Sequence, residues 1–503
     1  MSKTKEKTKL KQMEREKKIQ GKPRITYNEK RKRFEIPNRK SEHKTSEEEQ
    51  MERQETIEES VKVYRNMLPI LLNRLKKIKD PRQMSKVKHK LTVLMVYGIL
   101  NFVLQYTSRR KVNTEMTQPI FFENLKRLFP ELETMPHADS LERLLARIDV
   151  NEIQESLIDL FNDLIRSKKF RKYLYQNRYL FAFDGTQKLS RDEKWAEECS
   201  SKTFNKGKED EYTIYYAYVL ECVFIMDNGV TLPLYSEFID NKEHKSESNK
   251  QDTERNAFKR LAQKIKSRFP RLKISVTMDG LSCCGPILRL CRQFSWEFMI
   301  TFKEGCMPEV WKEALGLIKY TQENRLQCKW GERHQKYSWI NEVEHNFGEN
   351  ERLAEIVNVA ICEESWEEIS QKTKQAKQMS TRYVWVSSTP LTRKNIFDRC
   401  TKIGRPRWCI ENNFLVLKHH GYSYEHCFSY TWNAMVGYHY LMNIGRFMNV
   451  IVSNSDWIFD KVMEKGISGF LKFQRDALKA CKLDYKRIDD IVNERHYLKL
   501  YVA

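Results

Sequence analysis

The sequence predicts an α/β protein in which a mixed five-stranded sheet follows a helical N-terminal domain. Two observations support this prediction. Apolar residues recur at helical spacing from about residue 52 to residue 175, and the spacing changes to that of strands at Tyr179. Beyond Tyr179 we expect three consecutive strands and then a helix, a strand, a helix and a strand. That order gives a mixed sheet with helices on both faces.

Positive charge is concentrated at the N-terminus. The 503 residues include 90 Lys and Arg and 68 Asp and Glu, a formal net charge of +22. Residues 1–40 alone hold 16 basic and 5 acidic residues with almost no apolar periodicity, so we expect residues 1–50 to be a disordered basic arm. This excess favours a polyanionic partner, nucleic acid before membrane, over a basic surface that is merely solvated.

Neither a membrane span nor a secretion signal is expected. The longest apolar run, residues 91–104, is shorter than the roughly 20 residues that a transmembrane helix needs, and the N-terminus is charged. The 12 cysteines form no repeated Cys-x-x-Cys pair, which indicates reduced thiols in a cytoplasmic protein.

The helical domain is predicted to span residues 51–175. A buried helix at residues 91–104 is followed by a basic run, Arg109, Arg110 and Lys111. Basic turns on a helical domain favour nucleic-acid binding; the alternative is that the domain is only a scaffold.

Residues 176–307 are predicted to form the first part of the sheet. The expected elements are strands at 179–186, 212–226 and 230–239, a helix from residue 252, a strand at 273–280, a helix at 287–294 and a strand at 297–302. Asp227-Asn228-Gly229 provides a hairpin turn between the second and third strands. This order of elements is that of the ribonuclease H-like fold. Residues 308–378 alternate and are punctuated by turns, which predicts a β-rich insertion.

The second part of the sheet is predicted at residues 379–455, followed by a helical C-terminal tail at 456–503. It contains a strand at 381–388, a helix from about Pro406 and a long apolar helix at 433–452. On the helix from Pro406, three charged residues fall within roughly 40° of one another; they are Arg407, Glu411 and Lys418. This mixture beside apolar residues indicates either a functional site or an ordinary ion pair on a half-exposed helix.

Asp184 and Asp279 each follow an apolar run and precede a glycine. Either could be a turn residue, but in this strand order their strands are neighbours, and sites form at the carboxyl ends of such strands. Together with Glu411 they would give three converging carboxylates, which repel one another unless a cation neutralises them. Oxygen ligands favour Mg2+ or Mn2+, and two such ions support in-line phosphoryl transfer. Arg407 and Lys418 would then contact phosphates.

These motifs resemble those of the DDE transposases of bacterial insertion sequences. The resemblance is carried by DGT at Asp184, MDG at Asp279 and the spacing Arg407-x3-Glu411-x6-Lys418. It is to the group with a Tyr-Arg-Glu-Lys signature and a β-rich insertion before the catalytic Glu. Further similar segments are KQDTE at 250–254, FKEG at 302–305, the segment after Glu411, DPR at 80–82 and PHADS at 136–140. The resemblance extends from about residue 68 to residue 452.

The resemblance implies that Asp184, Asp279 and Glu411 are catalytic and hold two Mg2+ or Mn2+ ions. It also implies terminal inverted repeats and target DNA as partners, a helical domain that binds the DNA ends, a synaptic homodimer, and a location at the bacterial nucleoid. The sequence departs from the signature at Gly404, which stands in place of the Tyr. Trp408, Trp385 or Trp339 could instead stack on a flipped base, although a tryptophan at such a position is more often a core residue.

Two other functions remain compatible with these residues. The chain could be an inactive or domesticated DNA-binding protein, which the presence of all three carboxylates disfavours. It could also be a ribonuclease H-like nuclease that cleaves without joining strands.

Overall fold

The computed structural model describes residues 11–13, 43–242, 251–369 and 376–501. Most of the predicted basic arm, residues 1–50, lies outside the described residues. The last five residues of the predicted arm, 46–50, are helical, because helix α2 (Ser46–Leu75) begins at Ser46. Glu47, Glu48 and Glu49 occupy the first turn of α2, where carboxylates interact favourably with the helix dipole. Residues 51–503 pack as one unit.

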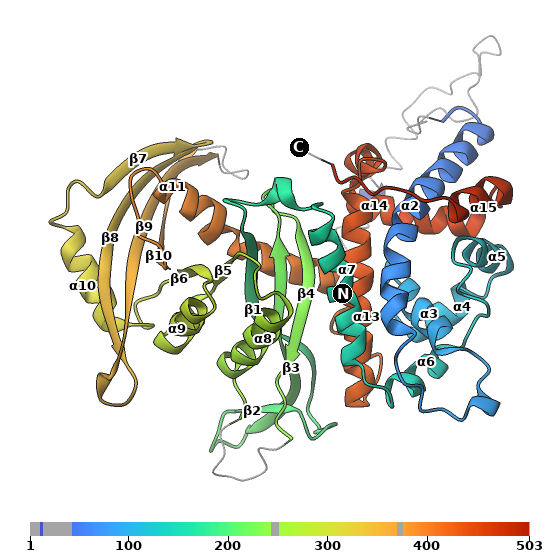
Figure 1. Cartoon of the computed structure of the whole chain (residues 1–503), viewed down its shortest axis with the longest axis horizontal. Helices are drawn as coiled ribbons and strands as arrows, with labels where there is room; N and C mark the ends of the chain where they lie inside the picture. The colour runs from blue at the N-terminus through green and yellow to red at the C-terminus, as the bar shows by residue number, and fades with distance from the viewer. Residues whose placement is uncertain (1–10, 14–42, 243–250, 370–375, 502–503) are drawn as a thin grey trace. The chain divides into compact units, whose positions relative to one another are not determined.

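The N-terminal part of this unit is helical. Its helices after α2 are α3 (Leu91–Val103), α4 (Arg109–Glu115), α5 (Pro119–Leu128), α6 (Ala138–Leu145) and α7 (Asn151–Arg166). All but one of the residues of α3 are buried, as expected for the apolar run at 91–104. The long helix α13 (Trp432–Ser453) packs on α3, α6 and α7 and on β4 of the sheet. In Figure 1 it lies between α3 and the sheet.

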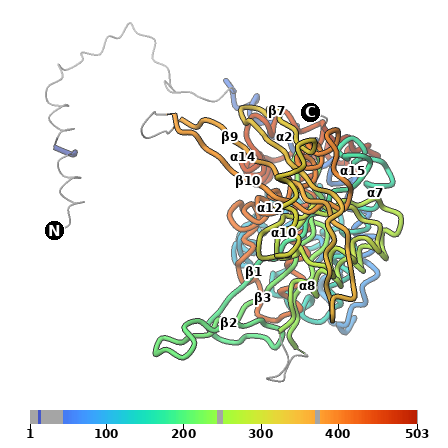
Figure 2. Tube along the Cα trace, turned by 90° about the vertical axis from the view of Figure 1, so that its left-hand side faces the viewer, coloured from blue at the N-terminus to red at the C-terminus, as the bar shows by residue number. Residues whose placement is uncertain are grey.

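The sheet has ten strands in the described residues. They are β1 (Tyr179–Arg191), β2 (Ser200–Phe204), β3 (Tyr212–Ile225), β4 (Thr231–Phe238), β5 (Ile274–Met278), β6 (Glu297–Thr301), β7 (Arg325–Trp330), β8 (Arg333–Phe347), β9 (Leu353–Ile369) and β10 (Ala376–Ser387). Their order is β2-β3-β1-β5-β6-β10-β9-β8-β7, with β4 also pairing with β3. The β1–β5 and β5–β6 pairs are parallel and the other pairs antiparallel. β2 was not predicted; Figure 2 shows it with β3 as a ribbon that extends away from the rest of the sheet.

The β-rich insertion continues the sheet. It opens with helix α10 (Pro308–Ile318) and then contributes β7, β8 and β9. β10 pairs with β9 along its whole length and also with β6, where Trp385 lies opposite Thr301. The insertion is therefore joined through β10 and β6 to the sheet that contains β1 and β5.

Helices α8 (Glu254–Arg268) and α9 (Gly285–Gln293) connect the parallel strands. After β10 the chain forms α11 (Ile396–Arg399), a π turn at Cys400–Gly404 and a 3-10 turn at Arg405–Arg407 before α12 (Trp408–His419). The predicted start of this helix at Pro406 is thus two residues early, because Pro406 lies in the 3-10 turn. The C-terminal tail is helical, as predicted: α14 (Phe459–Ala480) is broken into two shorter helices by a kink at Gly466, where φ is 68°, and α15 (Tyr485–Asn493) follows. No helix in the described ranges is both long and apolar enough to cross a bilayer.

Gly445 allows α13 to approach α3 closely. A Cβ atom at Gly445 would lie 2.6 Å from Cβ of Phe102 and 3.0 Å from the backbone nitrogen of Val103. We expect Gly445→Ala to lower the free energy of unfolding by about 1–3 kcal/mol, because the helix backbones would have to separate. Urea denaturation measures this loss. The control is Gly469→Ala on the exposed side of α14, where the nearest atom is 3.6 Å away; there we expect a gain of up to about 1 kcal/mol. Equal effects at the two positions would contradict the packing argument.

Candidate active site

The parallel pairing of β1 and β5 brings Asp184 and Asp279 into the same register. The ladder ends at the pair Phe183–Met278, so the two aspartates are the next residue on each strand. Asp279 leaves the ladder and caps the 3-10 turn at Gly280–Ser282, accepting a hydrogen bond of 3.0 Å from the Leu281 amide. The strand predicted at 179–186 is longer in the structure, because β3 continues to pair with β1 as far as Arg191. The parallel ladder between β1 and β5 ends just before Asp184.

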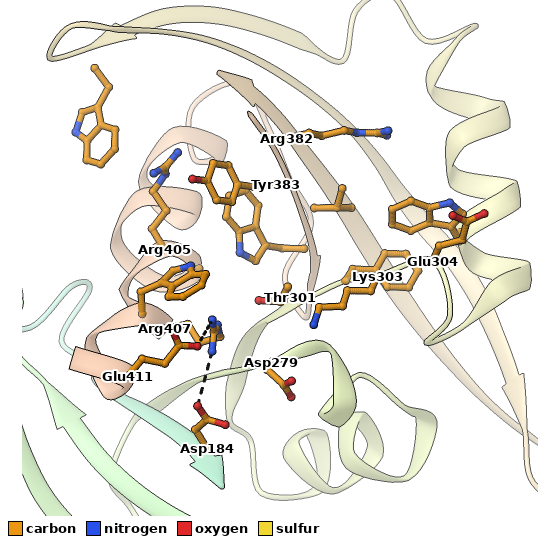
Figure 3. A pocket seen from close by; sticks show the side chains of 17 residues that line it. Asp184, Asp279, Thr301, Lys303, Glu304, Arg382, Tyr383, Arg405, Arg407 and Glu411 are labelled. Carbon is orange, nitrogen blue, oxygen red and sulfur yellow. Dashed lines mark ion pairs between the residues drawn. The ribbon is translucent and has the colours of Figure 1, made fainter. Parts of the chain in front are cut away.

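Arg407 links Glu411 to Asp184. Its Nη2 lies 2.8 Å from Oε1 of Glu411, and its Nη1 lies 3.9 Å from Oδ2 of Asp184 (Figure 3). The side chain of Arg407 is 8 % exposed, so the guanidinium is largely shielded from water. The i,i+4 ion pair that the sequence left open is therefore present, and it reaches a third charged group on a different element.

Asp184, Asp279 and Glu411 line one cleft of about 830 Å³. The remaining lining is mostly basic and aromatic, with Glu304 as a further carboxylate; its cations are Lys303, Arg382, Arg405 and Arg407, and its tryptophans and tyrosine are Trp311, Trp330, Tyr383, Trp385 and Trp408. In Figure 3, Lys303 and Arg382 lie across the cleft from Glu411. A cleft with carboxylates on one side and cations with aromatic rings on the other can hold a phosphate chain and its bases.

The charge balance of the cleft shifts the pKa of Asp184. Burial raises this pKa to about 6; the positive charge of Arg407 opposes the rise, and the negative charges of Asp279 and Glu411 add to it. Oxygen-only donors suit Mg2+ or Mn2+, so the chemistry of the three carboxylates fits such ions. Yet no three His, Cys, Asp or Glu side chains in the described part of the chain already surround a common metal position. In this structure the guanidinium of Arg407 supplies positive charge beside Asp184 and Glu411.

Glu254 is a fourth carboxylate at this site that sequence reasoning missed. It begins α8, and its Oε2 accepts a hydrogen bond of 3.1 Å from the hydroxyl of Tyr218. A Cβ at Gly185 would lie only 2.5 Å from the same oxygen, so the glycine after Asp184 is what admits Glu254. Burial raises the pKa of Glu254 to about 7, and the charges of Asp184 and Asp279 add to the rise. The signal was available in the KQDTE segment, which was noted only as part of the resemblance.

The other predicted DNA-binding residues lie apart from the carboxylates. Lys418 is not in the lining of the cleft; its Nζ lies 2.8 Å from Oε1 of Glu425. Arg109, Arg110 and Lys111 form the first turn of α4 in the helical region, where Arg109 pairs with Asp139 at 3.5 Å.

The three tryptophans proposed for stacking differ in exposure. Trp408 is 57 % exposed, and the guanidinium of Arg407 lies 4.6 Å from its ring centroid. Trp385 and Trp339 are buried in the core, so only Trp408 presents most of its ring to solvent.

The indole of Trp385 occupies the space beside Gly404, the residue that stands in place of the signature Tyr. A Cβ at Gly404 would lie 2.8 Å from the indole Nε1 of Trp385, so no larger residue fits. Tyr383 stacks on Trp385, with ring centroids 5.6 Å apart and planes at 10°, and it also lines the cleft.

Arg405 anchors the turn before α12 to the insertion. Its guanidinium lies between the rings of Trp330 and Tyr383, at 4.7 and 4.4 Å from their centroids. It also forms an ion pair with the fully buried Glu364, which Arg333 contacts from the other side at 3.0 Å. The insertion thus fixes the segment that carries Arg407.

The raised pKa of Asp184 makes stability depend on pH. Because the native carboxyl binds its proton more tightly than the unfolded one, the contribution of Asp184 to stability is greatest at low pH and is lost as pH rises through about 6. In EDTA at pH 8 we expect Asp184→Asn to be more stable than wild type by up to about 3 kcal/mol, and at pH 4 to lose most of that advantage. Urea denaturation at both values measures it. Asp192→Asn, at an exposed position, is the control; a gain for Asp184→Asn that is the same at both pH values would contradict the assignment.

Comparison with known families identifies part of the chain. Residues 72–161 match the family model described as DDE_Tnp_1-associated, and comparison with curated proteins gives no match. The matched segment comprises α3 to α6 with parts of α2 and α7, and it excludes the residues that line the cleft. The helical region therefore contains a transposase-associated domain, which points to a DDE transposase of an insertion sequence.

Proposed function

We propose that this protein is a DDE transposase that cuts the ends of an insertion sequence and joins them to target DNA. The observation that carries the proposal is the cleft itself, where carboxylates from β1, the end of β5 and α12 face a basic and aromatic wall. The transposase-associated domain at 72–161 supports it independently. So does the order of β1, β3, β4, α8, β5, α9 and β6, which is that of a ribonuclease H-like core.

Asp184, Asp279 and Glu411 would hold the metal. Two Mg2+ or Mn2+ ions bound there would activate the attacking hydroxyl and stabilise the leaving 3′ oxygen. For Glu411 to serve as a ligand, its carboxylate must exchange the guanidinium of Arg407 for the cation. Arg407 is then free to use its planar fork on a phosphate, with Trp408 beside it to stack on a base.

The remaining partners follow from the same proposal. A DDE transposase context implies DNA binding, and the helical domain would grip the terminal inverted repeats, with Arg109, Arg110 and Lys111 on backbone phosphates. We further propose a homodimer in the synaptic complex and a location at the bacterial nucleoid.

Neutralising any one of the three carboxylates should separate binding from cutting. We expect Asp184→Asn, Asp279→Asn and Glu411→Gln each to lower metal-dependent cleavage at least about 1,000-fold, because the cation loses a ligand. Binding of the DNA ends should stay nearly unchanged. Purified protein, its own element ends and Mg2+ are incubated, and nicked, hairpin and joined products are resolved on a gel.

The control for these variants is Glu304→Gln, an exposed carboxylate in the same cleft that we do not assign to the metal. It should cut at close to the normal rate. Cleavage by Asp279→Asn at the wild-type rate would contradict the assignment of the metal site. Cleavage by wild type without any joined product would favour the nuclease that does not transfer strands.

Lys418 should act on DNA affinity and not on metal binding. Because one phosphate contact is lost, we expect Lys418→Ala to reduce the slope of log affinity against log salt by about 1. Fluorescence anisotropy with labelled element ends at several salt concentrations measures this slope. Glu425→Gln removes the partner of Lys418 and should leave the slope intact or steepen it. An unchanged slope for Lys418→Ala would contradict the role.

A further inference from the structure

A second cavity lies on another face of the helix that carries Glu411. It has a volume of about 450 Å³ and is bounded by α12, α13, the start of β4 and the first turns of α14. α12 presents Asn412 and Asn413 to it, whereas Arg407, Trp408 and Glu411 line the carboxylate cleft. The two cavities therefore use different faces of one helix and share no residue that we assign to catalysis.

Arg446 of α13 lines this second cavity and has no counter-ion. It is 7 % exposed, and within the described ranges no carboxylate pairs with it and its buried Nε has no hydrogen-bond partner. The centroid of the Tyr422 ring lies 5.8 Å from Cζ of Arg446. The other buried arginines of the described chain do have partners: Arg399 pairs with Glu297, and Arg407 with Glu411.

An unpaired buried cation is costly. Removing one charge from water costs several kcal/mol unless an opposite charge and hydrogen bonds compensate for it. Ser453 lies about two turns further along α13. Its Oγ is a second buried polar atom without a partner at this cavity. Two such orphans at one cavity indicate that a polar ligand completes the site.

The lining of the cavity selects the charge of that ligand. It contains no Asp or Glu, so nothing in it would repel an anion. Oδ1 of Asn413 already accepts a hydrogen bond of 3.3 Å from the hydroxyl of Thr231, which leaves the amide NH2 as a donor. The guanidinium fork, the amide and the hydroxyl together match the oxygens of a phosphate. On the α14 side the wall is apolar, with Val462 and Met463, which suits a sugar or a base.

We propose that this cavity binds the phosphate of a nucleotide, with Arg446 as its principal ligand. Its volume falls within the range of small-molecule sites, roughly 300–1,000 Å³. The phosphate could belong to a free nucleotide or to a DNA strand, and the experiment below separates these sources. The proposal does not depend on the carboxylate cleft and stands whether or not the protein is a transposase.

The test measures binding of inorganic phosphate, a deoxynucleoside monophosphate and a single-stranded oligonucleotide to the full-length protein. Calorimetry at constant ionic strength gives affinities. Alkylation of Cys409, which lines the same cavity, is mapped by mass spectrometry and locates the ligand. We expect at least one of the three ligands to slow alkylation of Cys409, and Arg446→Gln to weaken its binding at least about tenfold. The control Lys472→Gln, at an exposed position on α14, should bind it like wild type.

Each outcome decides the proposal. Protection of Cys409 by phosphate and the mononucleotide supports a free-nucleotide site, and protection by the oligonucleotide alone supports a DNA strand. Protection by none of the three, or protection that persists in Arg446→Gln, overturns the proposal. Arg446→Gln should fold without ligand because it removes an unpaired charge; if it does not, Arg446→Lys, which keeps the charge but loses the fork, should show an affinity at least threefold below wild type. Equal affinity of Arg446→Lys and wild type would overturn the role of the fork.

Discussion

The cleft depends on the guanidinium of Arg407. Asp184 on β1 and Glu411 on α12 belong to elements more than 200 positions apart in sequence, and Arg407 lies within ion-pair distance of both. With Asp279 and Glu254 nearby, burial and the repulsion between carboxylates favour the protonated form of Asp184; even with Arg407 present, burial raises the pKa of Asp184 to about 6. One shielded cation therefore allows an acidic site to exist in the folded chain before any external cation arrives.

The β-rich insertion belongs to the same constraint. Arg407 follows Arg405 by two residues, and Arg405 is held between Trp330 and Tyr383 and paired with the buried Glu364. These partners come from β7, β9 and β10, which are hydrogen-bonded to the central sheet through β6. The position of α12 is consequently set from two directions, by its packing beside β1 and by an ion pair to the insertion. The buried Glu364 of the insertion thus contributes to the position of the helix that carries Glu411.

The sequence predicted what depends on local pattern and strand order. Asp184 and Asp279 could be placed at neighbouring strands because each apolar run is short and is followed by a glycine. Glu411 could be placed on a helix because Arg407, Glu411 and Lys418 recur at helical spacing. No local pattern places Glu254 at the site, since its approach depends on the absent side chain of Gly185, a contact across space; the resemblance of the KQDTE segment was the only signal for it. Lys418 shares the angular face of Arg407, but 11 residues of helical rise place it about 16 Å further along the axis, outside the cleft. β1 continues past Asp184 because it pairs with β3, and no local sequence pattern reveals this pairing.

The two cavities that border α12 lack counter-charges of opposite sign. On one face carboxylates outnumber the cation that holds them, and on the other Arg446 faces a cavity without any carboxylate. A divalent cation would complete the first face and a phosphate the second, and nucleic acid with its counter-ions supplies both. Residues of α12, a helix of 12 residues, line both cavities. A phosphate bound at Arg446 would supply the counter-charge that this buried arginine of α13 lacks in the folded chain.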